Sequence, residues 1–241
     1  MSPDLRSELA PTGTLRAGIN MSNFLLVSDR TADGGPVGVA ADMASEIAAR
    51  LGVPVTLVPF ASPGLLADEA ANNVWDIGLI GAEPARAEVM SFTAAYVEIE
   101  ATYLVPAGSP LHAIGDVDKP GVRIAVSARS AYDLYLTRHL QHAELIRAEG
   151  LNASYDLFVN ENLDALAGLR PRLISDVEKL PGAKVLDGGF TAVQQAIGTP
   201  KGREAGYAFL CDFVEEAKSS GLVAQLIERH NVRGLSVAPP A

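Results

Sequence analysis

The four histidines and the single cysteine of this 241-residue chain are the residues whose chemistry is most easily judged by spacing. His112, His139, His142 and His230 show neither the spacing of a metal site nor that of a nucleophile motif. A lone Cys211 excludes a disulfide within the chain and a cysteine-based zinc cluster, and free cysteines are usually buried, so we expect it in the core on a helix. The sequence therefore indicates no catalytic residue, no metal and no cofactor.

Two asparagines follow the first predicted strand. Residues 15–19 form a short apolar-rich run bounded by Gly13 and Asn20, which predicts a buried strand. Open α/β sheets place their ligands at the carboxyl ends of strands. Asn20 and Asn23 are therefore candidate ligand-binding residues.

Ser130 is a candidate ligand-binding residue at the start of a predicted helix. It precedes a predicted helix over residues 131–141, where a serine side chain can cap the helix. Such a start leaves backbone N–H donors and the positive end of the helix dipole open to an anion. Arg129 beside it can reach a second acidic group or lie in solvent, and a plain N-cap is the alternative interpretation of Ser130.

Polar residues on two later predicted strands complete the candidates. Glu98 and Glu100 alternate within VEIEATY, so they share one face that points to the ligand or to solvent. Gln194 and Gln195 are candidates for polar ligand contacts, and we expect at least one of them to be only a surface residue.

The elements that must position these residues alternate between strand and helix. In the first half we expect a helix over 41–51 that ends at Gly52, and in the second half a strand over 122–126 before the helix that starts near Ser130. Strand, helix, strand in succession is typical of a parallel sheet. The other predicted strands span residues 55–58, 76–80, 101–105, 184–186 and 192–197.

The chain breaks and restarts after residue 105. Pro106, Gly108 and Pro110 form a turn-rich segment, and the strand and helix pattern beyond it suggests a second α/β lobe. From Pro200 a helix is predicted, with the proline in its first turn and Gly221 as its stop, and a last helix spans 222–231.

Charge and hydropathy exclude some classes of function. The net charge of −10 and a pI near 4.8 argue against a nucleic-acid partner, because no cluster of Lys and Arg is present to bind phosphates. The start lacks the basic and apolar regions of a signal peptide, and no apolar run approaches the length of a membrane span. The chain as written would be cytoplasmic, although a removed signal peptide would leave the same appearance.

Five segments together resemble the family 3 solute-binding proteins, the group typified by amino-acid receptors of bacterial ABC importers. In order they are LRAGIN, GVAADMASEIAARLGVPVTLVPF, WDIGLIGAEPARAEVMSFTAAYVEIEATYLV, GVRIAVSARSAYDLYL and GYAFLCDFVEEAKSSGLVAQLIERHNV. The resemblance implies an α/β, two-lobed periplasmic-binding-protein-like fold of type II, with two crossing strands and a ligand cleft between the lobes. Lobe 1 would comprise residues 1–105 and 199–241, and lobe 2 the inserted residues 106–198.

The resemblance also assigns site residues. PARAEVMSFTAAY is similar to the segment whose arginine clamps the ligand carboxylate, which falls on Arg86, and a guanidinium fork matches two carboxylate oxygens. An exposed arginine at a helix start is the alternative. The segment from Asp76 to Arg86 is roughly two residues shorter than in the family. The family's aspartate that receives an ammonium group has no counterpart, since Leu169 or Arg170 stands there, and Glu100 could supply the missing anion.

These observations predict a non-enzymatic solute-binding protein. We expect a monomer that closes over a small carboxylate-containing polar ligand, an amino acid or a related organic acid, as the receptor of an ABC-type uptake system with a membrane permease as partner. It would be periplasmic if a signal peptide is removed. The alternatives are a cyclohexadienyl-dehydratase-like enzyme on the same fold, for which the arginines of RPRLISD are unfavourable, and an intracellular ligand-sensing protein without a signal.

Overall fold

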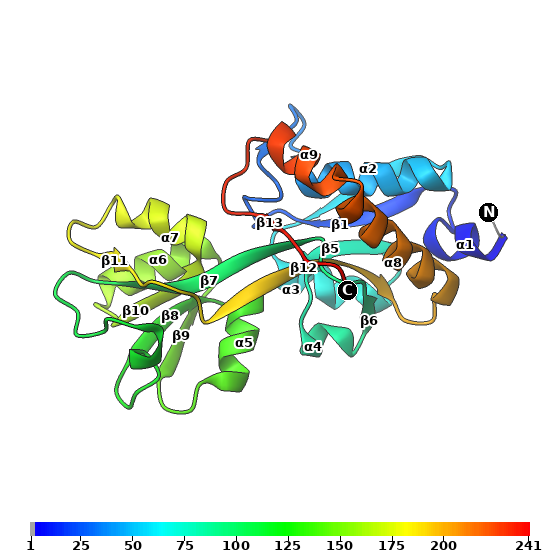
Figure 1. Ribbon diagram of the computed structural model, residues 1–241. Helices are drawn as coiled ribbons and strands as arrows, with labels where there is room; N and C mark the ends of the chain where they lie inside the picture. Colours follow the sequence, from blue (N-terminus) through cyan, green and yellow to red (C-terminus); the bar gives the residue numbers. More distant parts are fainter. Residues whose placement is uncertain (1–2) are drawn as a thin grey trace. The chain divides into compact units, whose positions relative to one another are not determined.

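The computed structural model describes residues 3–241, which divide into two compact units (Figure 1). Unit 1 comprises residues 3–98 and 194–241, and unit 2 comprises Ile99–Val193. The divisions fall inside the strands β7 (Val97–Val105) and β12 (Thr191–Pro200), so each strand contributes to both units. The predicted lobe boundaries, after residues 105 and 198, fall in the same two strands but nearer to their carboxyl ends.

The sheet of unit 1 is mixed. Strand β1 (Leu15–Asn20) lies between β4 (Val55–Phe60) and β5 (Ile77–Gly81) and is parallel to both. Strand β12 runs antiparallel to β5. Because β1, β4 and β5 are parallel, their carboxyl ends meet at one edge of the sheet, which is called the unit 1 edge below.

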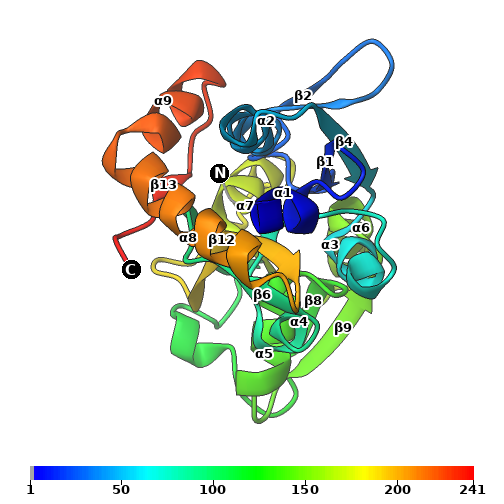
Figure 2. The same cartoon turned by 90° about the vertical axis from the view of Figure 1, so that its right-hand side faces the viewer.

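Helices α1 (Pro3–Leu9), α2 (Val39–Leu51), α8 (Glu204–Ser219) and α9 (Leu222–Arg229) share one apolar core with the sheet of unit 1. Helix α2 ends as predicted at Gly52, which has a φ of 63° and donates its N–H to carbonyls of the last turn. Helix α3 (Pro63–Asp68) lies on the opposite side of β1 and β4 from α2 (Figure 2). Among the described helices, none combines the length and the apolar character that crossing a membrane requires.

Trp75 fills the space between α3 and the sheet. Its side chain is completely buried, and its indole Nε1 donates to the carbonyl of Leu66 at 3.0 Å. Gly18 in β1 leaves room for it, since a Cβ there would lie 3.2 Å from the indole, and Gly78 in β5 leaves room for Leu66, since a Cβ there would lie 2.9 Å from that side chain. Two sheet glycines thus make room for the large side chains that pack between α3 and the sheet.

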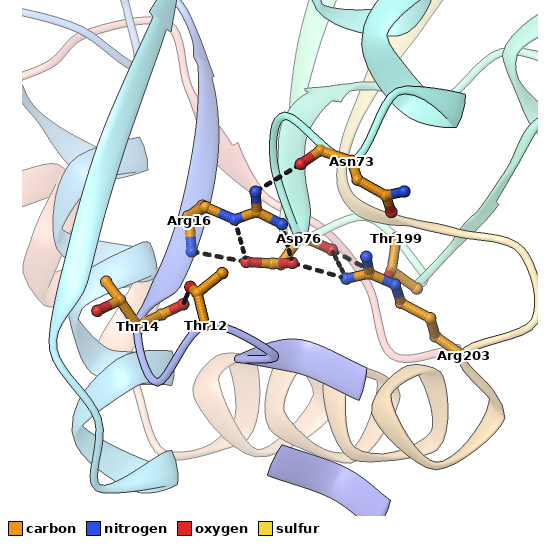
Figure 3. A network of polar contacts seen from close by, with 7 residues as sticks. All are labelled: Thr12, Thr14, Arg16, Asn73, Asp76, Thr199 and Arg203. Carbon is orange, nitrogen blue, oxygen red and sulfur yellow. Dashed lines mark hydrogen bonds and ion pairs between the residues drawn. The ribbon is translucent and has the colours of Figure 1, made fainter. Parts of the chain in front are cut away.

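A buried carboxylate joins elements at the opposite edge of the same sheet (Figure 3). Asp76 precedes β5 and is fully buried. It accepts hydrogen bonds from the Arg16 guanidinium at 2.8 and 2.9 Å and from Arg203 at 3.0 Å. Thr199 donates to its backbone carbonyl at 3.0 Å. The hydrogen bond to Asp76 raises the pKa of Arg16, and the network links β1, β5, β12 and the start of α8.

Unit 2 contains a sheet with three parallel strands. Strand β8 (Arg123–Ser127) lies between β9 (Glu144–Ala148) and β10 (Ala165–Leu169), while β7 runs antiparallel to β10. Helices α6 (Leu151–Asn160) and α7 (Arg170–Val177) lie on one side of β8 and β10, and α5 (Ala131–His139) lies on the other (Figure 1). The carboxyl ends of β8 and β10 form what is called the unit 2 edge below.

The remaining elements are short. They are β2 (Asp29–Arg30), β3 (Pro36–Val37), the 3-10 helices η1 (Glu69–Ala71) and η2 (Ile114–Asp116), α4 (Pro84–Ala87), β6 (Met90–Phe92), β11 (Lys184–Val185) and β13 (Ser236–Val237).

Two predictions in the last helices are wrong. Pro200 does not open a helix: it pairs with Met90 of β6 as the final residue of β12, and α8 begins only at Glu204. A proline is tolerated at such a strand end because the ladder requires no N–H donor there. Cys211 lies on a helix but is half-buried rather than in the core, because the buried face of α8 is formed by Leu210, Phe213 and its neighbours.

Tyr96 carries a buried polar atom that lacks a partner. Its side chain is fully buried in the core of unit 1, its hydroxyl makes no hydrogen bond, and burial raises its pKa. An unsatisfied buried hydroxyl costs stability, so we expect Tyr96→Phe to be stabilising by about 1 kcal/mol in urea unfolding at pH 7. Above pH 10 the wild type should lose stability, because the folded state resists ionisation of Tyr96 while the unfolded state permits it.

Tyr96→Phe should therefore lose less stability than the wild type between pH 9 and pH 11. The half-buried Tyr135 gives a matched control, since Tyr135→Phe should change stability by less than about 0.5 kcal/mol. A marked loss of stability in Tyr96→Phe at pH 7 would show that the hydroxyl has a partner.

Candidate functional site

Asn20 and Asn23 lie at the unit 1 edge, and hydrogen bonds from their own loop fix the orientation of both side-chain amides. The Asn20 Oδ1 accepts from the backbone and hydroxyl of Ser22 at 3.2 and 2.7 Å, and the Asn23 Oδ1 accepts from the N–H of Leu25 at 3.2 Å. Both residues are buried, and neither amide nitrogen donates to another described residue. The acceptor end of each amide is used by the loop itself, so the donor end is what each side chain can offer to a ligand.

Arg86 also belongs to the unit 1 edge. It lies on α4, which follows the carboxyl end of β5, and only 4% of the residue is exposed. Its Nη1 donates to the backbone carbonyl of Gly81 at 2.6 Å. The alternative of an exposed surface arginine is therefore wrong. A guanidinium has five N–H donors, so Arg86 can donate to more than one acceptor.

Gln194 and Gln195 lie beside the same strand end. The carbonyl of Gln194 accepts from the N–H of Ala82 at 2.7 Å, and Gln195 pairs with Gly81 across β12 and β5. Gln194 is half-buried. Gln195 is buried, and its Oε1 has no hydrogen-bond partner. Gln195 is therefore not a surface residue, whereas the partial exposure of Gln194 is compatible with the surface position expected for at least one of the two.

Ser130 caps α5 as predicted, at the unit 2 edge. Its Oγ accepts from the N–H of Asp133 at 3.1 Å. The Asp133 carboxylate in turn accepts from the N–H of Arg129 at 2.7 Å and from the Arg147 Nε at 2.9 Å. The side chains of Tyr132 and Ser130 are hydrogen-bonded to each other, and burial raises the pKa of Tyr132 to about 12. An acidic group of the protein itself thus already occupies the first turn of this helix.

Arg129 has an unusual backbone for its residue type. Its φ is 58°, in the left-handed region. The other described non-glycine residues with positive φ are all asparagines, which tolerate that region: Asn73, Asn162 and Asn231. The hydrogen bond from its N–H to Asp133 holds the turn in place, and the residue is exposed beside the buried cap residue Ser130.

Glu100 is already engaged within unit 2. The Arg170 Nε donates to its Oε2 at 2.5 Å, and the Arg170 Nη2 lies 3.4 Å from its Oε1. The same Nη2 donates to the carbonyls of Leu186 and Gly188 at 3.0 and 2.8 Å. Arg170 is the first residue of α7 and directly follows β10, so this ion pair lies at the unit 2 edge.

The structure thus gathers the candidates into two groups, one per unit. The unit 1 edge brings together Asn20, Asn23, Arg86 and Gln194, and the unit 2 edge brings together Glu100, Arg129 and Ser130. The sequence interpretation missed Asp133 and Arg147, although the spacing of Ser130 and Asp133 matches that of a cap residue and its partner three residues later. Within residues 3–241, no group of three or more His, Cys, Asp or Glu side chains is placed to hold a metal ion.

Residues 15–232 match the family described as bacterial extracellular solute-binding proteins, family 3. The chain belongs to this family. The α/β fold of type II periplasmic binding proteins, which the sequence predicted, is confirmed by the similarity to solved structures. The comparison with curated proteins found no significant match.

Three solved structures illustrate the similarity. A putative ABC transporter binding component from Wolinella succinogenes, complexed with lysine, is 21% identical with a TM-score of 0.75 over 90% of this chain and 95% of that one. An amino acid ABC transporter substrate-binding protein from Streptococcus pneumoniae, bound to L-arginine, is 19% identical with a TM-score of 0.74 over 92% and 96%. A reconstructed ancestral amino acid-binding protein, a precursor of cyclohexadienyl dehydratase, is 22% identical with a TM-score of 0.73 over 92% and 97%.

Proposed function

We propose that this solute-binding protein is the receptor component of an ABC-type uptake system and binds a small polar ligand through a carboxylate. The ligand would be an amino acid or a related organic acid, and we expect both units to contact it as the protein closes over it. The family is one of extracellular proteins, and similar proteins are named as parts of amino acid transporters, which supports a role outside the cytoplasm with a membrane permease as partner.

Arg86 is the observation that carries this proposal. It is a buried guanidinium at the carboxyl end of β5, and the carbonyl of Gly81 engages one of its donors. Ligands of open α/β sheets bind at such strand ends. The amide donors of Asn20 and Asn23 belong to the same edge, so the unit 1 edge offers hydrogen-bond donors together with a positive charge. A carboxylate matches that combination.

The test is the loss of binding in Arg86→Ala. Native mass spectrometry of protein purified without denaturation identifies the bound ligand, and calorimetry then measures its affinity. Hydrogen bonds to a charged partner are worth about 1.5–3 kcal/mol, so Arg86→Ala should bind at least about tenfold more weakly. Arg86→Lys should recover only part of the affinity, because a lysine keeps the charge without the planar fork.

Arg30→Ala is the matched control, because it removes an exposed arginine from the same unit and should bind like the wild type. Circular dichroism verifies that each variant is folded. If folded Arg86→Ala binds the ligand as tightly as the wild type does, the carboxylate anchor is refuted.

An enzymatic function finds less support. A dehydratase needs a general acid whose pKa is raised. Both carboxylates placed at the unit 2 edge, Glu100 and Asp133, form ion pairs with arginines. We therefore propose a binding protein and not an enzyme.

A further inference from the structure

We propose that the side-chain carbonyl of Gln195 accepts a hydrogen bond from the ligand, so that the ligand carries a donor close to its carboxylate. A hydroxyl or an amino group on the carbon next to the carboxylate would supply this donor. This inference rests on the proposed function, because it specifies the ligand of the same unit 1 edge. Gln195, Gly81 and Arg86, the residues that carry it, all belong to unit 1.

Gln195 has a buried acceptor that no described residue satisfies. Only 4% of the residue is exposed, and its Oε1 accepts no hydrogen bond. Buried polar groups of folded proteins nearly always have a partner, because an unsatisfied one retains the full cost of its desolvation. The unligated protein therefore bears a cost that a ligand with a suitably placed donor would remove.

The location of Gln195 distinguishes it from the other unsatisfied groups. Within residues 3–241, two further buried side-chain atoms lack a hydrogen-bond partner, Tyr96 Oη and Glu215 Oε1. The Lys218 Nζ lies 2.6 Å from Glu215 Oε1, so that carboxylate has an ionic partner. Tyr96 belongs to the apolar core of unit 1. Gln195, in contrast, lies beside the carboxyl end of a parallel strand, where open α/β sheets bind their ligands.

The register of β12 with β5 determines the position of this side chain. Gln195 pairs with Gly81, the last residue of β5, and Ile197 pairs with Leu79. Paired residues place their side chains on the same face of a sheet. Leu79 and Ile197 are buried in the core of that face, and Gln195 follows where the strand β5 ends. Because Gly81 has no side chain, β5 offers the Gln195 amide no side-chain partner.

Gly81 also connects Gln195 with the proposed anchor of the carboxylate. The carbonyl of Gly81 accepts from the Arg86 Nη1 at 2.6 Å, and Gln195 lies directly opposite Gly81 on the neighbouring strand. No donor of the Arg86 guanidinium satisfies the Gln195 Oε1. The donors of Arg86 and the unused acceptor of Gln195 thus both adjoin one residue at the end of β5.

The asparagines of the unit 1 edge offer donors instead of acceptors. Asn20 and Asn23 use their Oδ1 atoms within their own loop. An ionised carboxylate without a further polar group has acceptors only, so it would leave the Gln195 Oε1 unsatisfied. The hydroxyl of a 2-hydroxy acid and the ammonium group of a 2-amino acid are both donors that can satisfy it.

The experiment compares carboxylates that differ only at the carbon next to the carboxylate. The three series are propanoate, L-lactate and L-alanine; succinate, L-malate and L-aspartate; and 3-phenylpropanoate, L-3-phenyllactate and L-phenylalanine. We expect calorimetry on the intact protein to show binding of a donor-bearing acid at least about tenfold tighter than that of its parent acid, in every series with measurable binding. The hydroxy and amino members distinguish the two kinds of donor.

Gln195→Met tests whether Gln195 causes this preference. Methionine is unbranched and adaptable, and it has no strong acceptor. The preference for the donor-bearing acid should shrink at least about tenfold, while the affinity for the parent acid should stay within about twofold of the wild-type value. Gln225→Met is the matched control, because Gln225 is an exposed glutamine on α9 of the same unit. Its preference should equal that of the wild type.

Urea unfolding without ligand gives an independent measurement. Gln195→Met removes an unsatisfied buried acceptor, so its urea midpoint should lie above that of the wild type. Gln225→Met should leave the midpoint unchanged. A midpoint of Gln195→Met that is no higher than the wild-type value would show that the amide has a structural partner, such as a buried water, and the inference would be wrong.

The binding outcomes separate this inference from the proposed function. If acids with and without a donor bind equally well, the inference is wrong while the carboxylate-binding proposal stands. The same conclusion holds if Gln195→Met retains the wild-type preference. If no probe binds, both proposals are contradicted for the small carboxylates that the panel covers.

Discussion

Asp76→Asn should lower the free energy of unfolding by about 3 kcal/mol, because it removes the charge that two partly buried arginines share. Asp76 is fully buried, and the side chains of Arg16 and Arg203 are 21% and 12% exposed. An asparagine keeps the shape, yet it places an amide where one carboxylate oxygen now accepts from a guanidinium. Urea unfolding followed by circular dichroism measures the loss.

The control for this result is an exposed ion pair of the same unit. Arg50 and Glu216 approach to 2.6 Å, but their side chains are 31% and 62% exposed. Solvent screening makes such pairs weak, so Glu216→Gln should change stability by no more than about 0.5 kcal/mol. Equal losses in Asp76→Asn and Glu216→Gln would show that burial does not strengthen the network of Figure 3.

Trp75→Ala should cost about 4 kcal/mol, as expected for removal of a large aromatic side chain from a packed core. The indole is completely buried and donates to the carbonyl of Leu66. Gly18, whose missing side chain makes room for it, has no atoms with which to fill the space that it would leave. Circular dichroism during urea unfolding gives the measurement.

Leu65→Ala is the matched control on the adjacent helix. Leu65 lies on α3 with 49% of its surface exposed, so its truncation should cost less than about 0.5 kcal/mol. If Trp75→Ala is no more destabilising than Leu65→Ala, the indole is not a main contact between α3 and the sheet.

The fold of unit 1 was largely predictable because its elements carry strong local signals. The buried strand before Asn20 and the helix that ends at Gly52 were both expected close to their observed limits. In unit 2 the prediction lacked β9, α6, β10 and α7. Strand β10 has the sequence ALAGL, which lacks β-branched residues and does not alternate, because both faces of the strand are buried. Packing and not local preference makes it a strand.

For the candidate site, the sequence could indicate residue types but not their partners. The cap role of Ser130 follows from its position before a helix, and the structure shows it. Glu100 and Arg170 lie 70 residues apart in sequence, and only the antiparallel register of β7 with β10 brings them together. No spacing rule connects such residues. The sequence suggested Glu100 as the acceptor for an ammonium group, but it could not show that Glu100 forms an ion pair with Arg170.

The position of Trp75 also allows the unfolding of unit 1 to be followed by fluorescence. It is the only tryptophan of the chain, and it belongs to unit 1. Four of the six tyrosines belong to unit 2: Tyr103, Tyr132, Tyr135 and Tyr155. Indole fluorescence therefore follows the core of one unit, while tyrosine absorbance is weighted towards the other. Unfolding transitions followed by indole fluorescence and by tyrosine absorbance coincide only when both units unfold together. A single sample therefore distinguishes cooperative unfolding of the whole molecule from independent unfolding of the two units.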